Sequence, residues 1–188
     1  DSTGLFAFEH QFDDDIWRFP DGFDVVQKDG KWGFVIKGQF VIEPQFESVD
    51  IINDFEEGLC WVVKNQKLGY INTMGQVIIE PQFDNGESFK GGVALIVKDN
   101  KVGYINSFGQ MIVEPKYEEA RSFEYNIARV KKDGKWGFID TTGQFIIHPQ
   151  FGSVSDFSEG LAAVEQDGKW GFIDTKGQLI IYTQFRRV

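Results

Sequence analysis

Carboxylates that recur at a fixed place are the residues of this sequence with the clearest capacity for chemistry. Glu43, Glu80 and Glu114 each stand directly before a proline, and more acids follow in the next loops. Rows of carboxylate oxygens are ligands that Ca²⁺ prefers, and two carboxylates held close together could support a hydrolase. No segment, however, has the alternating Asp/Asn and Gly pattern of a calcium loop. We therefore expect these acids to be solvated or paired with lysines that recur at the same interval. Those lysines are Lys31, Lys67, Lys101, Lys135 and Lys169.

Histidine and cysteine offer little for catalysis or metal binding. His10 and His148 fall at the ends of expected outer strands, and neither lies near a motif for a nucleophile and its base. Cys60 is the only cysteine, so an internal disulfide is impossible, and its place in a strand favours a buried thiol. There is no glycine-rich phosphate loop, HExxH or CxxC motif. The sequence therefore predicts no enzymatic activity, no metal and no cofactor.

A tandem repeat must position all of these residues. Lys-Trp-Gly-Phe occurs at residues 31–34, 135–138 and 169–172, with weaker copies at 67–70 and 101–104. The second residue of the motif advances by 36, 34, 34 and 34 positions. A period in this range indicates one small supersecondary unit copied along the chain, each copy burying its apolar surface against the next. The motif residues are expected to be structural: Trp32, Gly33, Gly69, Gly103, Trp136, Gly137, Trp170 and Gly171.

Each unit predicts a three-stranded antiparallel β-meander with the Trp-Gly strand in the middle. In the last unit, Asp167-Gly168 separates two apolar runs, and a Thr-Lys-Gly turn precedes a third. Both are hairpin signals. The turn lengths predict that Trp32 pairs with Glu43 and that Trp136 pairs with His148. Both faces of the meander are apolar, so the sheets should stack face to face, with the tryptophans in the core.

The predicted fold class is all-β, with five tandem meanders stacked as an open solenoid-like array. Six outer strands against five middle strands favour the open array, and a five-bladed propeller-like ring is the alternative. The chain is expected to be a single domain over residues 1–188. Its units are 12–45, 46–82, 83–116, 117–150 and 151–184, with a partial unit at 1–11.

The repeats resemble those of the WG-repeat (KWG-repeat) proteins, which are mostly bacterial. The family unit reads Gly-Lys-Trp-Gly-Phe-Ile-Asp, a glycine turn, an apolar strand with proline, then Phe-Ser-Glu-Gly-Leu-Ala. Residues 157–162 match that last element, and the resemblance covers residues 4–185. Leu68 and Val102 depart from the pattern in place of tryptophan, and residues 12–21 keep only its spacing. The resemblance implies a binding or surface module and no defined activity.

Composition narrows the choice of partners. A net charge of −10 disfavours nucleic acid and anionic membrane surfaces. No run approaches 18 apolar residues, so insertion into a membrane is not expected. The sequence begins with Asp1 and its first methionine is Met74, which suggests a processed form or an excised piece. The compartment stays open between exported, cell-surface and cytoplasmic.

Together these observations favour a non-enzymatic repeat scaffold that presents an acidic surface to a partner protein or polymer. Trp17 and Trp61 are aromatic candidates beside the acids, although Trp17 also fits a cap on the end of the stack. The alternative is a structural subunit of a surface assembly or filament, joined through unpaired outer edge strands. The candidate binding residues are Asp13, Asp14, Asp15, Trp17, Glu43, Asp50, Asp54, Trp61, Glu80, Asp84 and Glu114.

Overall fold

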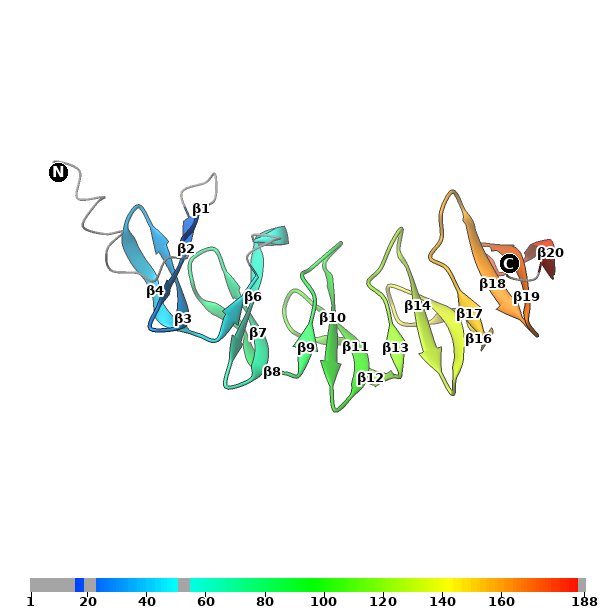
Figure 1. Cartoon of the computed structure of the whole chain (residues 1–188), viewed down its shortest axis with the longest axis horizontal. Helices are drawn as coiled ribbons and strands as arrows, with labels where there is room; N and C mark the ends of the chain where they lie inside the picture. Colours follow the sequence, from blue (N-terminus) through cyan, green and yellow to red (C-terminus); the bar gives the residue numbers. More distant parts are fainter. Residues whose placement is uncertain (1–15, 19–22, 51–54, 186–188) are drawn as a thin grey trace. The chain divides into compact units, whose positions relative to one another are not determined.

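The repeat folds as a series of small antiparallel sheets. The computed structural model describes residues 16–18, 23–50 and 55–185, and these form five four-stranded sheets of consecutive strands (Figure 1). The predicted all-β fold of five antiparallel meanders is confirmed. Contacts divide the chain into two compact parts, residues 1–88 and 89–188, and each part is described by itself. The choice between an open array and a ring stays a prediction.

The strand bounds follow the repeat. The first sheet comprises β1 (Ile16–Arg18), β2 (Phe23–Lys28), β3 (Lys31–Ile36) and β4 (Gln39–Phe46). The second comprises β5 (Ser48–Val49), β6 (Leu59–Lys64), β7 (Lys67–Asn72) and β8 (Val77–Phe83), with the 3₁₀ turn η1 (Glu56–Gly58) before β6. The third comprises β9 (Asn85–Gly86), β10 (Val93–Lys98), β11 (Lys101–Asn106) and β12 (Met111–Tyr117). The fourth comprises β13 (Glu119–Ala120), β14 (Ile127–Lys132), β15 (Lys135–Asp140) and β16 (Phe145–Phe151). The fifth comprises β17 (Ser153–Val154), β18 (Leu161–Gln166), β19 (Lys169–Asp174) and β20 (Leu179–Phe185).

A two-residue strand that the sequence did not predict begins each of the last four sheets. In the fifth sheet it is β17, where Val154 pairs with Val164 of the inner strand β18. One bend residue separates this short strand from the outer strand of the preceding sheet. The bend residues are Glu47, Asp84, Glu118 and Gly152. The chain therefore passes from one sheet to the next through a single residue, and a strand of two residues is too short to show a period in the sequence.

The pairing of middle and outer strands differs from the prediction. Trp32 pairs with Phe46, and Trp136 pairs with Phe151, so the predicted pairings with Glu43 and His148 are wrong by three residues. The ladder shifts on both sides of Phe138, while Phe138 itself pairs with Ile147. The outer strand bulges where its proline lies, because proline has no N–H to give to the ladder.

Glycine in the Trp-Gly motif is required by the path of the bulged outer strand. A Cβ atom on Gly137 would lie 2.5 Å from the carbonyl oxygen of Ile147 and 2.6 Å from the nitrogen of Pro149. Gly33, Gly69 and Gly103 are equally close to the backbone of their own outer strands. Because these neighbours are backbone atoms, no rotation of a side chain could relieve the overlap. The outer strand thus crosses directly over the middle strand at this residue.

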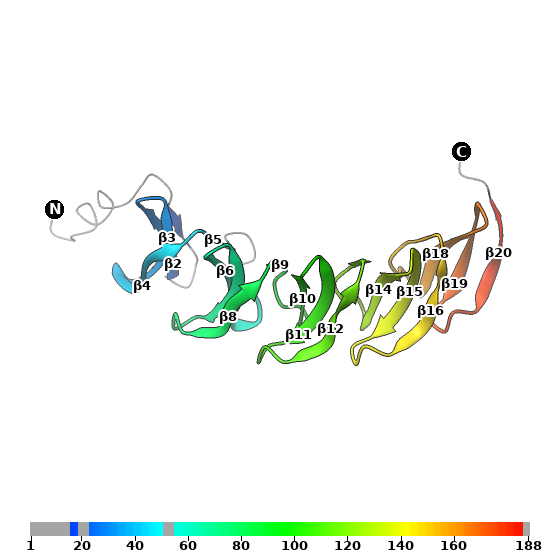
Figure 2. The same ribbon diagram turned by 90° about the horizontal axis from the view of Figure 1, so that it is seen from below.

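A second glycine, in the outer turn of three of the repeats, brings neighbouring sheets together within a part. Gly75 and Gly143 have φ of 77° and 81°, and a Cβ on them would lie 2.6 Å from Cγ1 of Ile42 and 2.5 Å from Cγ2 of Val113. Gly177 stands in the same way 2.9 Å from Cγ1 of Ile147. The outer turn of each of these sheets therefore rests on the outer strand of the sheet before it. Figure 2 shows the three sheets of the second part side by side in chain order.

Aromatic residues fill the space between sheets of the same part. The Phe123 ring centroid lies 4.8 Å from that of Tyr104, and the Phe157 centroid lies 4.8 Å from that of Phe138. The buried Tyr104 hydroxyl also donates a hydrogen bond of 2.6 Å to the carbonyl oxygen of Arg121, in the segment that leads into the next sheet. These contacts close the apolar core between sheets.

The motif tryptophans are less buried than predicted. Trp32, Trp136 and Trp170 are half-buried, whereas Leu68 and Val102 in the same position are buried. The Arg129 guanidinium and the Lys131 ammonium lie 5.6 Å and 5.8 Å from the Trp136 ring centroid, in cation–π range. An indole is larger than the space that holds a leucine or valine, so the ring extends to the rim of the sheet.

Bend residues join successive sheets by charge. The Glu47 carboxylate accepts hydrogen bonds from the backbone N–H of Asn65 at 3.1 Å and of Gln66 at 2.9 Å, in the hairpin of the next sheet. It also lies 3.6 Å from Nζ of Lys31. The turn amides, led by that of Gln66, lower the pKa of Glu47. Glu118 accepts a corresponding bond of 3.1 Å from the backbone N–H of Gly134.

The last bend residue, Gly152, has no carboxylate, and a residue of the next sheet takes over its role. Oε1 of Glu165 accepts a hydrogen bond of 2.5 Å from the backbone N–H of Gly168, in the hairpin that a bend acid would otherwise cap. A Cβ on Gly152 would lie 2.1 Å from Oε2 of Glu165. Only one of the two positions, 152 or 165, therefore needs to carry the carboxylate that caps this hairpin.

The glycine crossing predicts a large effect from one methyl group. We expect Gly137→Ala to lower the free energy of unfolding by about 3 kcal/mol, because its Cβ would press on two backbone atoms. Gly134→Asn is the control, since Gly134 has open space around it and Asn100 occupies the equivalent turn position with φ of 58°. Urea unfolding followed by circular dichroism measures both. Equal stability of the two variants would refute the crossing.

The shared carboxylate predicts coupling between two positions. Gly152→Glu and Glu165→Val should each destabilise the protein, the first by bringing a second carboxylate beside that of Glu165 and the second by leaving the Gly168 N–H uncapped. The double variant should recover stability, because valine already stands at the equivalent Val63 and Val97 and the new Glu would cap the turn. A double-mutant cycle on unfolding free energies should give a favourable coupling of about 1 kcal/mol. Simple additivity would contradict the exchange.

Candidate binding surface

The outward side of the outer strands is where the predicted acids gather. In β4, Val41, Glu43 and Gln45 are exposed, while Ile42 and Phe46 between and beyond them are buried. Side chains alternate between the two faces of a strand, so the exposed set points away from the core. In β8, the equivalent Ile78, Glu80 and Gln82 are all exposed. Each outer strand of the first part therefore presents an aliphatic residue, a carboxylate and an amide in the same order.

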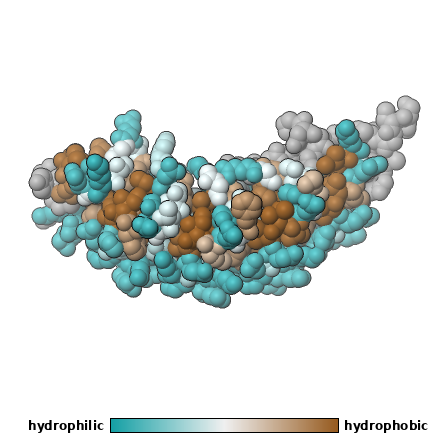
Figure 3. All heavy atoms as spheres, turned by 180° about the vertical axis from the view of Figure 1, so that it is seen from behind, coloured by the Kyte–Doolittle hydropathy of each residue, from teal (hydrophilic) through white to brown (hydrophobic). Residues whose placement is uncertain are grey.

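The second part repeats this order with changes. Glu114 is exposed on β12, and the exposed His148 takes the place of the carboxylate on β16. The ring centroid of His148 lies 4.9 Å from that of Phe145 on the same strand. Figure 3 shows hydrophobic residues along the middle of one face of each part and hydrophilic residues along its lower rim.

The exposed acids fall into two groups, those that form hydrogen bonds or ion pairs with the scaffold and those that do not. Among the described residues, the side chains of Glu43, Glu80 and Glu114 make no hydrogen bond or ion pair with the rest of the protein. Asp84 is also exposed, but it forms an ion pair with Lys67. This predicted site residue is therefore one of the bend acids that contact the scaffold. The acids before the prolines are thus among those that make no contact within the described scaffold, and they share one repeat position.

Asp50 was predicted to lie on the acidic surface, and this is wrong. Its side chain is only 3% exposed, and the Ser88 hydroxyl donates a hydrogen bond to its Oδ2. The backbone N–H of Asp50 bonds to the carbonyl oxygen of Trp61 at 3.0 Å, which holds the residue against the inner strand β6. The loop therefore turns this carboxylate inward, where it contributes to the scaffold.

The other predicted residues are placed as follows. Trp61 is half-buried on β6, opposite Tyr70 of β7. Trp17 pairs with Val25 through its backbone in β1, and its side chain lies outside the description. Asp13, Asp14, Asp15 and Asp54 lie outside the described residues. The structure therefore places Glu43 and Glu80 at equivalent positions on the outer strands of neighbouring sheets, whereas Trp61 lies on the inner strand β6.

Exposed apolar residues at the outer turns were missed by the sequence reasoning. Met74 is 65% exposed and Phe108 is 79% exposed at the same repeat position. Each stands in a turn closed by an Asn side chain: Oδ1 of Asn72 accepts from the N–H of Met74 at 3.0 Å and of Gln76 at 2.9 Å. This turn directs the residue into solvent. The available signal was the alignment of Met74 and Phe108 with the polar Thr142 and Lys176.

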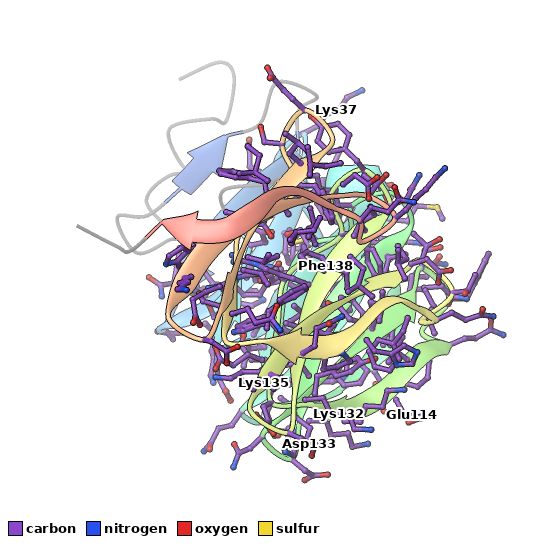
Figure 4. The ribbon with its side chains drawn as sticks, turned by 90° about the vertical axis from the view of Figure 1, so that its right-hand side faces the viewer. Lys37, Glu114, Lys132, Asp133, Lys135 and Phe138 are labelled. Atoms are coloured by element: carbon purple, nitrogen blue, oxygen red, sulfur yellow. The ribbon has the colours of Figure 1, made fainter. Side chains whose placement is uncertain are left out.

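Lysines flank the turn between the inner and middle strands of each sheet. Lys132 and Lys135 face each other across β14 and β15, and Figure 4 shows both beside Asp133 at the tip of that hairpin. The same cross-strand pairing joins Lys28 to Lys31, Lys64 to Lys67 and Lys98 to Lys101. Like charges directly opposite each other are unfavourable, and the bend acids Glu47 and Asp84 offset part of this charge. The basic hairpin tips are thus distinct from the acidic outer strands.

In the part of the chain that the structure describes, no group of three His, Cys, Asp or Glu side chains lies close enough to hold a metal ion. Cys60 is 1% exposed, with its sulfur 3.6 Å from the carbonyl oxygen of Asp50. No helix among the described residues has the length and apolar character needed to cross a membrane.

Comparison with solved structures shows likeness of fold at low sequence identity. A structure titled as the eukaryotic initiation factor is 12% identical, with a TM-score of 0.51, over 88% of this chain and 53% of that one. Hsv2 of Kluyveromyces lactis is 11% identical, with a TM-score of 0.47, over 83% of this chain and 58% of that one. The chain thus spans less than two thirds of the length of either protein. No curated protein matches it.

Family comparison agrees with the repeat seen in sequence and structure. The model described as "WG containing repeat" matches residues 1–32, 36–67, 69–101, 103–136, 136–170 and 170–188. These matches cover nearly the whole chain and coincide with the Trp-Gly middle strands, their hairpins and their bulged outer strands. This protein belongs to the WG-containing-repeat family.

Proposed function

We propose that this protein is a non-enzymatic repeat scaffold that binds a cationic partner protein or polymer through its outer strands. The observation that carries the proposal is the position of Glu43, Glu80 and Glu114. They are exposed at one repeat position and have no partner among the described residues, whereas the bend acids are engaged in the scaffold. Regularly placed and unneutralised carboxylates attract and orient a partner of opposite charge.

The groups that most often perform covalent or acid–base chemistry are used here for folding. The Cys60 thiol is buried against backbone carbonyls, and the Asp50 carboxylate is buried with the Ser88 hydroxyl. Burial, with smaller contributions from the charges of Glu87 and Asp50, raises the pKa of Tyr70, whose hydroxyl donates to the carbonyl oxygen of Glu87 at 2.7 Å. These contacts support a binding role over a catalytic one.

The proposal predicts that charge at the outer strands, rather than total charge, governs binding. The triple variant Glu43→Gln, Glu80→Gln, Glu114→Gln should bind a fluorescein-labelled oligolysine several-fold more weakly than the wild type. The control is Asp29→Asn, Asp133→Asn, Asp167→Asn, which also changes the net charge from −10 to −7 (−10 + 3). Asparagine suits this turn position, because Asn65 already occupies it in the second sheet with φ of 52°.

Fluorescence anisotropy at low and high salt separates the outcomes. Binding through the outer strands should be lost in the Glu variant, persist in the Asp variant and weaken as salt shortens the Debye length below about 10 Å. Equal losses in both triple variants would mean that only total charge matters and would contradict the proposed surface.

A second candidate function, assembly into a larger structure, has one specific observation in its favour. Ile181 on β20 is 37% exposed, whereas Ile147, Val113, Ile79 and Ile42 at the same position are 5%, 3%, 4% and 7% exposed. Ile180 beside it is 52% exposed. In the sheets that have a following sheet in the same part, this position receives the next glycine turn. The outer strand of the fifth sheet thus offers an apolar place for another sheet.

Assembly predicts a mass that depends on concentration. Light scattering on a size-exclusion column should show growth with concentration for the wild type and a constant mass for Ile180→Lys, Ile181→Lys. A wild-type mass that stays constant over the whole range would rule out this route. Growth that persists in the double variant would place the joint elsewhere.

A further inference from the structure

An exposed apolar cluster lies on the outer strands of the first part. Among the described residues, eight large apolar side chains are exposed, and four of them belong to β4, β8 and the turn before β8. They are Val41 at 40%, Met74 at 65%, Val77 at 42% and Ile78 at 40%. We call these four residues the Met74 patch.

The members of the Met74 patch meet at one contact between two sheets. The turn at residues 73–75 rests on β4, since a Cβ on Gly75 would lie 2.6 Å from Cγ1 of Ile42 and 3.2 Å from the carbonyl oxygen of Val41. Val77 and Ile78 follow one residue after this turn as the first residues of β8. The turn that carries Met74 thus lies against the strand that carries Val41, so four exposed apolar residues belong to one contact between two sheets, whereas exposed apolar residues that stand singly are common on protein surfaces.

Other repeats do not keep this cluster. Thr142 and Lys176 occupy the position of Met74, and Ile112 and Ile146 at the position of Ile78 are half-buried. The scaffold therefore tolerates polar residues at the turn and does not need the exposed methionine. An unbranched and adaptable methionine in such a place is typical of surfaces that bind apolar side chains of varied shape.

Carboxylates border the Met74 patch on the same outward side. Glu43 lies two residues beyond Val41 on β4, and Glu80 lies two residues beyond Ile78 on β8, so each points the same way as its aliphatic neighbour. Both are exposed and have no ion pair or hydrogen bond with another described residue. Stacked sheets are about 10 Å apart, which places the two carboxylates on a spacing that an extended peptide can span.

We infer that the Met74 patch docks an extended cationic peptide segment of a partner protein. An apolar side chain of the peptide lies against Met74 and Ile78, and its lysine or arginine side chains meet Glu43 and Glu80. Charge complementarity selects this occupant, because the acidic border and the net charge of −10 repel an acidic segment. The inference rests on the proposed function and adds to it the class of partner and the apolar contact.

The experiment uses three labelled peptides of equal length and one matched pair of variants. The peptides alternate Lys with Leu, Lys with Ser, or Glu with Leu. The test variant is Met74→Thr, and the control is Phe108→Thr at the same turn position in the second part; both turns accept threonine because Thr142 has it naturally. Thermal unfolding by circular dichroism verifies that both variants fold.

The expected pattern is specific to the patch. The Lys/Leu peptide should bind the wild type most tightly, and Met74→Thr should weaken it about tenfold, as expected for an apolar side chain that loses its burial site. Met74→Thr should leave the Lys/Ser peptide unchanged, and Phe108→Thr should leave both cationic peptides unchanged. The Glu/Leu peptide should not bind.

Other results overturn the inference and identify what fails. If Lys/Ser binds as tightly as Lys/Leu, or if Met74→Thr has no effect on Lys/Leu, the apolar contact is refuted. The proposed function would still stand if the Glu43→Gln, Glu80→Gln, Glu114→Gln variant loses both cationic peptides. If no cationic peptide binds the wild type, the inference and the proposed function fail together.

Discussion

The contact between the outer strand and the glycine of the Trp-Gly motif is the constraint on which each sheet depends. The carbonyl oxygen of Ile147 and the nitrogen of Pro149 occupy the space that a Cβ on Gly137 would need. This explains why all five copies of the motif keep their glycine while tryptophan gives way to Leu68 and Val102. At the glycine, two backbones are in direct contact and leave no room for a side chain. The tryptophan position lies at the edge of the sheet, where a smaller apolar side chain can take the place of the indole.

The same distinction separates rigid from replaceable features between sheets. The turn glycines Gly75, Gly143 and Gly177 combine a positive φ with close contact to the preceding strand, so no other residue serves there without strain. The carboxylate that caps the next hairpin, by contrast, can come from the bend at Glu47 or from the strand at Glu165. The turn amides require a carboxylate at one place on the surface, but residues at different positions in the sequence can supply it.

The sequence predicted the elements well and their pairing poorly. Asp-Gly and Thr-Lys-Gly identified the hairpins, because those turns need residues that accept positive φ. The register failed at Trp136, since a bulge opposite a glycine leaves no trace in apolar periodicity, although Pro149 in the outer strand was a clue. Asp50 failed for a related reason: composition marks an aspartate in a loop as exposed, and only the backbone bond to Trp61 turns it inward. The acids Glu43, Glu80 and Glu114 were found because their spacing alone gave them the same position in the repeat, which is exposed in each sheet.

Comparison of repeats within this one chain therefore distinguishes the scaffold from the proposed binding surface. The middle-strand position that lies against the outer-strand backbone holds glycine in every unit, and the positions of Ile42 and Phe46 hold apolar residues in every unit. The outward positions hold Glu, Glu, Glu and His before the prolines, and Met, Phe, Thr and Lys in the outer turns. No packing demand explains these choices, because a threonine or lysine meets the turn geometry as well as Met74 does. Residues that the fold leaves free and that nevertheless bring apolar groups next to unpaired carboxylates are best explained by something outside the chain, and on this protein they come together at Met74, Glu43 and Glu80.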